Sequence, residues 1–495
     1  MSKIYKPFWP LALYLYGLIA IFSIAGCSSM APVYQRPDAP VAAQWPTQAD
    51  AGVVATPALP DWQNYFTDVT LRQLIDIALI NNRDLRIATL NIEQARAQLG
   101  LRRADLFPAL NLTVGGTRTP TSTGSISTTY TGGLTITAFE LDLFGRVASL
   151  KEQALAQYLA TREAAQAAQI SLVATVAQGW LALLTDEDML RAATQTLATR
   201  EASLKLVELK VRHGASSDLE WRLAQTLTES ARVTLAQQQR QRALDENALT
   251  LVLGQALPAA AKAVLSPDPT SSAVPTASAG MTSPGRLDTL HFAEIPAGLP
   301  SDLLTRRPDI RAAELTLQAS NANIGAARAA FFPRISLTAG LGSVSAALSD
   351  LFKNGTWGLT LSPQLLLPIF DAGRNQANLE ASKASRDIAV AQYEKSVQSA
   401  FREVADALAA RATLAQQLQA STALLTAESE RARLTKLRLD AGAANQLDWL
   451  DAQRSLFAAQ QTLMQTQLAA LQNQVVLYKV LGGGLDASPP WQAAK

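Results

Sequence analysis

The feature that most restricts the fold of this chain is a pair of long stretches without helix-breaking residues. Residues 374–441 contain no glycine, and residues 369–488 contain no proline. In the earlier stretch 146–213 the only glycine is Gly179. Continuous helices over these stretches would each be roughly 100 Å long at about 1.5 Å per residue, which is too long for a compact domain. We therefore expect them to pack side by side.

The sequence also contains two copies of one pattern. Residues 84–116 resemble residues 309–340, with Phe107-Pro108 matching Phe332-Pro333. Further on, RHGASSDLEW, which contains Gly214, matches DAGAANQLDW, which contains Gly442. Glycine at these two places suits the end of a helix before a tight turn. Two long copies indicate an internal duplication rather than an array of short repeats.

Each copy predicts the same order of elements, namely a helix, two strands and a pair of very long helices. The strands are indicated by apolar residues that alternate with small or polar ones, as in Leu110, Leu112 and Val114, or Leu134, Ile136 and Ala138. In the first copy the expected elements are a helix at about 70–105, strands within about 107–141 and long helices at 146–254. In the second copy they are a helix at about 301–330, strands within about 333–368 and long helices at 373–481.

The predicted organisation of the whole chain follows from these landmarks. It consists of a signal peptide (1–26), an extended N-terminal segment (27–68), repeat 1 (69–254), a Pro/Ser/Ala-rich linker (255–300), repeat 2 (301–482) and a C-terminal tail (483–495).

The N-terminus indicates export from the cytoplasm. Lys3 and Lys6 precede an apolar run that ends in IAGC at 24–27, which is typical of a secretory signal. Cys27 is the only cysteine, so it is either an incidental thiol or the acylated first residue of the mature chain. The small residues before it resemble the lipobox of bacterial lipoproteins, and Ser28 after it resembles a signal for sorting to the outer membrane.

The rest of the chain predicts a membrane β-barrel shared between chains. Beyond residue 26 we expect no apolar run near the ~20 residues of a membrane helix, so a crossing segment would have to belong to a closed barrel. Four strands cannot close alone, since membrane barrels begin at about eight strands. Several chains must therefore contribute, with the long helices in the periplasm.

Composition and motifs argue against other classes of protein. The formal net charge is +2 without a concentrated basic block, so we expect no nucleic-acid partner. His213 and His291 are the only histidines, and no nucleophile motif or phosphate-binding loop is present. We expect no enzymatic activity, no metal and no cofactor apart from a covalent lipid at Cys27.

The start of the last long helix carries the candidate site. Trp449, Leu450, Leu456 and Phe457 belong to one apolar stripe. The opposite side carries a leucine, two acids and a base: Leu447, Asp448, Asp451 and Arg454. These groups have two interpretations. An acid near a helix N-terminus simply favours the helix dipole, and an acid and a base three residues apart form an ordinary pair. Alternatively, they form rings in a pore, where apolar rings constrict and acidic rings select cations.

Several long, ungapped motifs resemble the outer-membrane efflux proteins, which are TolC-like, and within them the lipoprotein OprM/NodT branch. They are YQRPDAP (34–40), FELDLFGRV (139–147), LLTRRPDIRAAE (303–314), LPIFDAGR (367–374), LDAQRSLFAAQ (450–460) and VVLYKVLGGG (475–484). The resemblance implies a lipid-anchored homotrimer in the bacterial outer membrane, with a twelve-stranded β-barrel and a twelve-helix periplasmic barrel. It further implies an exit duct for drugs and other small molecules that docks onto a periplasmic adaptor and an inner-membrane pump.

The resemblance also assigns roles to the candidate site. In the family, the positions of Asp448 and Asp451 are gate acids, and those of Leu447 and Arg454 contribute to the constriction and its tethering contacts. The alignment of the two copies adds Glu220, which matches Asp448. The periplasmic end would be closed at rest and loosened by the adaptor. Two alternatives stay open, namely a channel for protein secretion and a lipid-anchored periplasmic coiled-coil scaffold without a pore.

Overall fold

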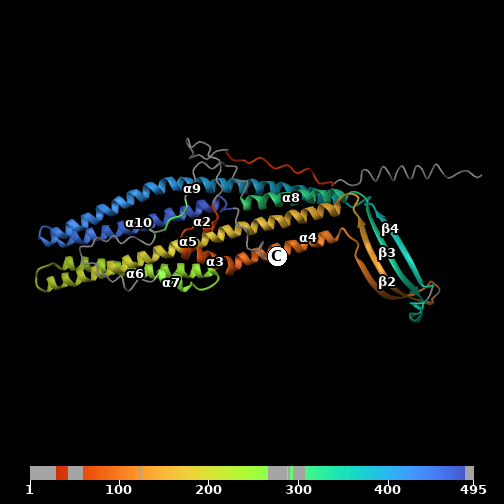
Figure 1. Ribbon diagram of the computed structural model, residues 1–495, viewed down its shortest axis with the longest axis horizontal. Helices are drawn as coiled ribbons and strands as arrows, with labels where there is room; N and C mark the ends of the chain where they lie inside the picture. The colour runs from red at the N-terminus through yellow and green to blue at the C-terminus, as the bar shows by residue number, and fades with distance from the viewer. Residues whose placement is uncertain are drawn as a thin grey trace, which may run out of the picture. The chain divides into compact units, whose positions relative to one another are not determined.

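The structure is a computed structural model that describes residues 29–42, 60–122, 124–265, 287, 290–293, 307–353 and 355–484. The predicted signal peptide, Cys27 and most of the predicted linker lie outside the described residues. The chain forms two compact units, whose elements are labelled in Figure 1. Unit 1 contains Met1–Ala39, Leu90–Glu163 and Asp309–Ser396, and unit 2 contains Pro40–Thr89, Ala164–Pro308 and Val397–Lys495.

Unit 1 contains a single antiparallel sheet, formed by both repeats in the order β1-β2-β3-β4 (Figure 1). Its strands are β1 (Leu110–Pro120), β2 (Ile126–Leu141), β3 (Arg334–Ser345) and β4 (Trp357–Leu366), with a short 3-10 helix, Leu348–Asp350, before β4. The repeats meet where β2 pairs with β3, with Leu134 opposite Leu341. The outer edges of β1 and β4 have no strand partner among the described residues.

The leucines of the predicted apolar face are exposed, as are their small and polar neighbours in β1 and β4. Leu112 of β1 is 75% exposed and Leu359 of β4 is 77% exposed. The alternation predicted for Leu134, Ile136 and Ala138 is wrong at its last member. The β2–β3 register shifts between Ile136 and Phe139, and Ala138 has a positive φ of 49°. This is a β-bulge, which inserts one extra residue and moves the following side chains to the other face.

The long helices confirm the prediction from the absence of glycine and proline. Helix α5 (Arg146–Arg212) and helix α9 (Arg374–Asp440) each run for 67 residues. They are followed by α6 (Asp218–Leu253) and α10 (Gln446–Val480). Gly214 and Gly442 lie in the connecting turns with φ of 71° and 73°, a left-handed conformation that glycine adopts without strain.

The helix predicted at 70–105 is wrong as a single element. It is divided into α3 (Val69–Asn81) and α4 (Arg83–Ala104) by Asn82, whose backbone is extended. The Asn82 side chain accepts a hydrogen bond from the Leu85 amide at 2.8 Å and donates one to the Val252 carbonyl at 2.8 Å. A side chain that caps the next helix in this way competes with helix continuation. The matching helix of repeat 2 is α8 (Pro308–Ala329).

Two short helices lie in segments for which no helix was predicted. Helix α2 (Trp62–Tyr65) falls in the predicted extended segment, and α7 (Ala259–Leu265) falls at the start of the predicted linker. Tyr65 of α2 stacks on Tyr478 of α10 with ring centroids 4.3 Å apart, and its hydroxyl donates to the Gln474 carbonyl at 2.9 Å. The segment before α3 is therefore part of the core of unit 2.

The expectation that no helix after residue 26 resembles a membrane span is wrong for α5. By length and composition alone, α5 is apolar enough to cross a membrane, and half of its most apolar window is buried inside the chain. Between Glu163 and Asp186 the sequence has no charged residue. Val176, Trp180 and Leu183 of this run are fully or almost fully buried. The uncharged run therefore supplies the core of unit 2, as the core helix of a large water-soluble unit also does.

Candidate functional site

The residues predicted for the site lie in unit 2, at the turns of two helical hairpins. Hairpin α9–α10 turns between Asp440 and Gln446, and hairpin α5–α6 turns between Arg212 and Asp218. Leu447, Asp448, Asp451 and Arg454 occupy the first turns of α10, whereas Glu220 occupies the first turn of α6.

The apolar stripe of α10 packs as predicted. Leu450 is 3% exposed and lies in a buried cluster with Val207 of α5 and Ala224 of α6. Leu456 lies in a second buried cluster with Ala432 of α9. The beginning of α10 is thus fixed against three helices by apolar contacts, which leaves its other side available for polar groups. On that side Leu447 is exposed, as predicted.

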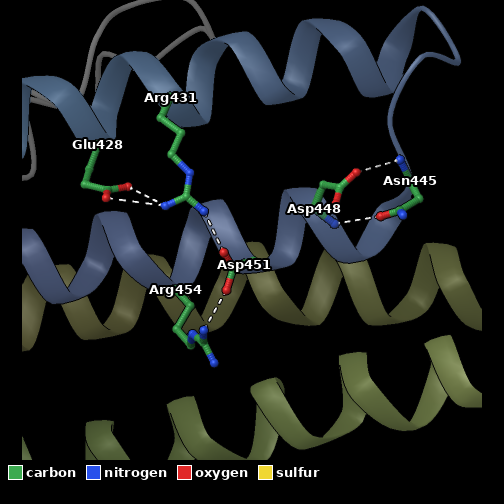
Figure 2. Close-up of polar contacts among 6 residues, drawn as sticks. All are labelled: Glu428, Arg431, Asn445, Asp448, Asp451 and Arg454. Carbon is green, nitrogen blue, oxygen red and sulfur yellow. Dashed lines mark hydrogen bonds and ion pairs between the residues drawn. The ribbon is translucent and has the colours of Figure 1, made fainter.

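Asp448 takes part in the N-terminal cap of its own helix, whose capping residue is Asn445. Its backbone amide donates to Asn445 Oδ1 at 2.8 Å, and its carboxylate accepts from the Asn445 amide at 3.2 Å (Figure 2). This reciprocal capping box satisfies two amides that a helix N-terminus otherwise leaves unpaired. Asp448 therefore lies in the first turn of its helix, where an acid also favours the helix dipole, and one of its carboxylate oxygens stays outside the capping box.

Glu220 repeats the arrangement at the start of α6. Its amide donates to Ser217 Oγ at 3.3 Å, and its carboxylate accepts from the Ser217 amide at 3.2 Å. The Ser216 hydroxyl also contacts the carboxylate. These hydrogen bonds from Ser216 and from the Ser217 backbone lower the pKa of Glu220, because they favour its charged form. The same kind of capping box therefore begins the second long helix of each repeat.

Asp451 connects α10 to α9. Its Oδ2 lies 2.5 Å from Arg431 Nη2 and its Oδ1 lies 2.6 Å from Arg454 Nη2 (Figure 2). Arg431 is also 3.1 Å from Glu428 of its own helix. The hydrogen bond that Arg431 donates to Asp451 raises the pKa of Arg431, because it favours the charged guanidinium. Asp451 and Arg454 therefore form the ion pair predicted from their spacing. Asp451 also pairs with Arg431 of α9, so that one carboxylate binds two arginines.

Arg431 was missed by the sequence analysis, which examined α10 alone. A signal was present, because Arg431 and Asp451 lie at similar separations from Gly442 on either side of the turn. In an antiparallel helical hairpin such residues come opposite each other. The interaction between α9 and α10 could have been found by counting outward from that glycine.

A second missed residue is Arg200 of α5, which lies beneath Arg454. It is 6% exposed, its Nη1 donates to the Leu227 carbonyl at 2.9 Å, and its guanidinium lies 5.9 Å from the centre of the Phe457 ring. Burial, together with the charge of Arg454, lowers the pKa of Arg200. Arg200 thus adds a buried positive charge near the positive charge of Arg454.

Among the described residues no group of three or more histidine, cysteine or acidic side chains could hold a metal. The site contains a helix cap, an ion network between two helices and an exposed leucine. These groups can hold two helix ends together and present charge to a solvent-filled space. An open antiparallel sheet whose strands alternate apolar residues with small or polar ones is typical of a channel protein of the outer membrane.

Comparison with known proteins identifies the family. A family model described as outer membrane efflux protein matches residues 74–255 and 299–483, one match in each repeat. The chain is 45% identical over 480 residues to the antibiotic efflux pump outer membrane protein ArpC of Pseudomonas putida. The aligned region covers 94% of this chain and 94% of ArpC. The toluene efflux pump outer membrane protein TtgC of the same species has the same identity and coverage.

A solved structure gives the same result for the fold. The open state of the MtrE outer membrane channel of Neisseria gonorrhoeae is similar to this chain with a TM-score of 0.80 at 38% identity, covering 92% of this chain and 99% of MtrE. The chain belongs to the outer membrane efflux protein family. The predicted fold class, efflux function and outer-membrane location are thereby confirmed.

Proposed function

We propose that three copies of this chain form the exit duct of an efflux system, which receives small apolar compounds from an inner-membrane pump through a periplasmic adaptor. The open sheet supports the trimer. With β1 and β4 unpaired at the edges, three chains would give a closed barrel of twelve strands and remove every edge. An outward face with residues such as Leu112 and Leu359 suits lipid. A duct of this kind needs no catalytic residue.

The two repeats provide a second argument for neighbouring chains. At Gly325 of α8, an added Cβ would lie 2.6 Å from Ser149 Oγ of α5, so these helices touch closely. Gly100 of α4 is the matching residue in repeat 1, and an added Cβ there would meet no atom within 4 Å. Within one chain, Gly325 of α8 is therefore in close contact with α5, whereas the matching surface at Gly100 of α4 is open. A second chain, through its α9, would fill it.

We further propose that the site at the start of α10 is the periplasmic gate. In a ring of chains the exposed side of α10 would face the lumen, so Leu447, Asp448 and Asp451 would each form a ring. The ion network of Asp451 supports this assignment, because it ties the end of α9 to the start of α10. An adaptor that separates these ends would widen the opening. Glu220 of the other hairpin would contribute mainly through its cap.

Asp451→Ala, alone and together with Asp448→Ala, is expected to increase single-channel conductance in planar bilayers several-fold. The change removes the carboxylate that holds Arg431 of α9 and Arg454 of α10, so that the ends of the two helices are no longer tied together. The control is Asp218→Ala, which removes an exposed acid from the first turn of α6 at the other hairpin. We expect no change there. Equal conductance of the wild type and the Asp451 variants would remove Asp451 from the gate.

The transport proposal is tested in cells. The relatives are named for the efflux of antibiotics and of toluene, so we propose small apolar compounds as the cargo. Co-expression with a candidate adaptor and pump should restore growth of an efflux-deficient strain on toluene and on an antibiotic panel. Restored secretion of a protein substrate without drug resistance would instead support a secretion channel. A purified protein that never conducts would support a scaffold without a pore.

Lipid anchoring is a separate proposal. Cys27 lies outside the described residues, and its acylation is supported by the lipobox-like sequence before it. A lipid at this position would add to the anchoring that the sheet supplies. A single acyl chain without a second contribution binds membranes only weakly. The mass of the mature N-terminal peptide would establish or exclude the modification.

A further inference from the structure

Residues 29–38, which we call the strap, lie along α8 in unit 1. Arg328 near the end of α8 donates from Nη1 to the Met30 carbonyl at 3.1 Å, and Asn321 donates from Nδ2 to the Pro32 carbonyl at 2.7 Å. Arg36 and Tyr34 reach Glu314, closer to the start of the helix. The strap therefore runs antiparallel to α8, with its first residues at the end of the helix that leads into β3.

The strap occupies the place where α8 meets α5. An added Cβ at Gly325 would lie 2.7 Å from the Ala31 amide nitrogen and 2.6 Å from Ser149 Oγ, so only glycine leaves room for the strap and for α5 together. Ser29 Oγ also lies 3.4 Å from Ser149 Oγ. Because α5 belongs to repeat 1 and α8 to repeat 2, the strap contacts both repeats at their junction.

Glu314 is built to receive the other end of the strap. Its side chain is 10% exposed, and its two oxygens accept from Arg36 Nε at 2.8 Å and from Arg36 Nη2 at 2.5 Å. The Tyr34 hydroxyl donates to the same carboxylate at 3.1 Å. Burial and the negative charge of Glu314 raise the pKa of Tyr34 to about 12, so the phenol stays protonated and can donate. A two-pronged arginine–carboxylate pair also fixes orientation.

Glu314 and Asn321, which bind the strap, occur on α8 and are absent from the matching positions of α4. At the matching positions of α4, repeat 1 has Thr89 in place of Glu314 and Arg96 in place of Asn321, although Gly100 keeps the glycine. Helix α4 therefore offers neither the carboxylate nor the amide that hold the strap. The difference between the repeats places the strap on α8 only, and it ties the N-terminus to one defined position.

We propose that the strap is a latch, with Glu314 as its receptor, which holds the lipid-bearing N-terminus beside the sheet. Only Ser28 lies between Ser29 and Cys27, so about 7 Å of extended chain joins them. Met30 is bound by Arg328, and β3 begins at Arg334. A lipid on Cys27 would thus enter the membrane next to the strands and act on their insertion as an intramolecular anchor of high effective concentration. This role rests on the lipidation proposed above, whereas the latch itself does not.

The latch is tested with a nitroxide label at Val33→Cys in the full chain. Val33 is 88% exposed, so the label does not disturb the contact. The chain also carries Cys27→Ser and a non-lipoprotein signal, which removes the only native cysteine and leaves position 33 as the single labelled site. Glu314→Gln is expected to raise the mobility of the label markedly, and the exchange Arg36→Glu with Glu314→Arg to restore its immobilisation. The control is Glu163→Gln, which removes the 3.0 Å ion pair with Arg311 between α5 and α8 but leaves the strap contacts.

Two results would overturn the latch: a label that is equally mobile in the wild type and in Glu314→Gln, or one released as fully by Glu163→Gln. The coupling to the lipid is measured separately, as the fraction of heat-modifiable oligomer in outer membranes. Glu314→Gln should lower this fraction several-fold in the acylated chain. In a chain with Cys27→Ser and a non-lipoprotein signal it should have no effect. An equal effect in both chains would overturn the coupling while leaving the latch intact.

Discussion

Replacing Gly254 by alanine is expected to destabilise the folded chain by about 3 kcal/mol, the sum of backbone strain and a steric clash. Gly254 ends α6 with a φ of 72°, a left-handed conformation that penalises any Cβ. The added Cβ would also lie 2.4 Å from the Asn81 carbonyl oxygen and 2.9 Å from its carbon. These are backbone atoms at the end of α3, next to the Asn82 break, and cannot move without disturbing both helices.

Gly214→Ala separates the two contributions. Gly214 has nearly the same φ, 71°, but an added Cβ would meet no atom within 4 Å. We expect a loss of only about 1 kcal/mol there, from the left-handed backbone alone. The comparison requires thermal unfolding of both purified variants in the same detergent. Similar decreases in the midpoint would show that α6 and α3 separate easily and that the clash at Gly254 is relieved.

Glu140→Ala is expected to cost about 2–3 kcal/mol, because it leaves two arginines without their shared carboxylate in a partly buried site. Glu140 lies at the end of β2 and its side chain is 10% exposed. Its oxygens lie 2.8 Å from Arg146 Nε and 2.6 Å from Arg146 Nη2, and Oε2 is also 2.6 Å from Arg334 Nε. These contacts join β2, the start of α5 and the start of β3.

The matched variant is Arg334→Ala, which removes the more exposed arginine and leaves the pair between Glu140 and Arg146 intact. Arg334 is 56% exposed, so its loss should cost less than about 1 kcal/mol. The fraction of heat-stable oligomer and the unfolding midpoint report the difference. The assignment of Glu140 as the centre of this network fails if both variants lose the same stability.

Features with a local cause were predictable from the sequence. The long helices followed from the absence of glycine and proline, and the apolar stripe of α10 followed from its spacing. The strands followed from the alternation of apolar residues with small or polar ones. In each case the residues that determine the element are close together in the sequence, so the local pattern of residues is enough to predict it.

Features that depend on distant residues were not predictable in this way. Asn82 divides α3 from α4 because it binds Val252, a residue of another helix. The bulge at Ala138 depends on pairing with the second repeat. Arg431 and Arg200 reach the site of Asp451 and Arg454 from α9 and α5. The residues on α10 were found from one helix, whereas their partners required the packing of several.

The two capping boxes and the ion network of Asp451 have an architectural consequence. Both hairpins begin their second helix in the same way, at Glu220 and at Asp448, but Asp451 and Arg454 are matched in the first copy by Leu223 and Thr226. A ring of three such chains would contain six hairpins of two alternating kinds. The first kind joins its helices by ion pairs well away from the turn, as between Arg232 and Glu201, whereas the second kind also joins them close to the turn, between Arg431 and Asp451. A duplicated chain can therefore vary one hairpin near its turn and keep the other unchanged, which a ring of six identical hairpins could not do.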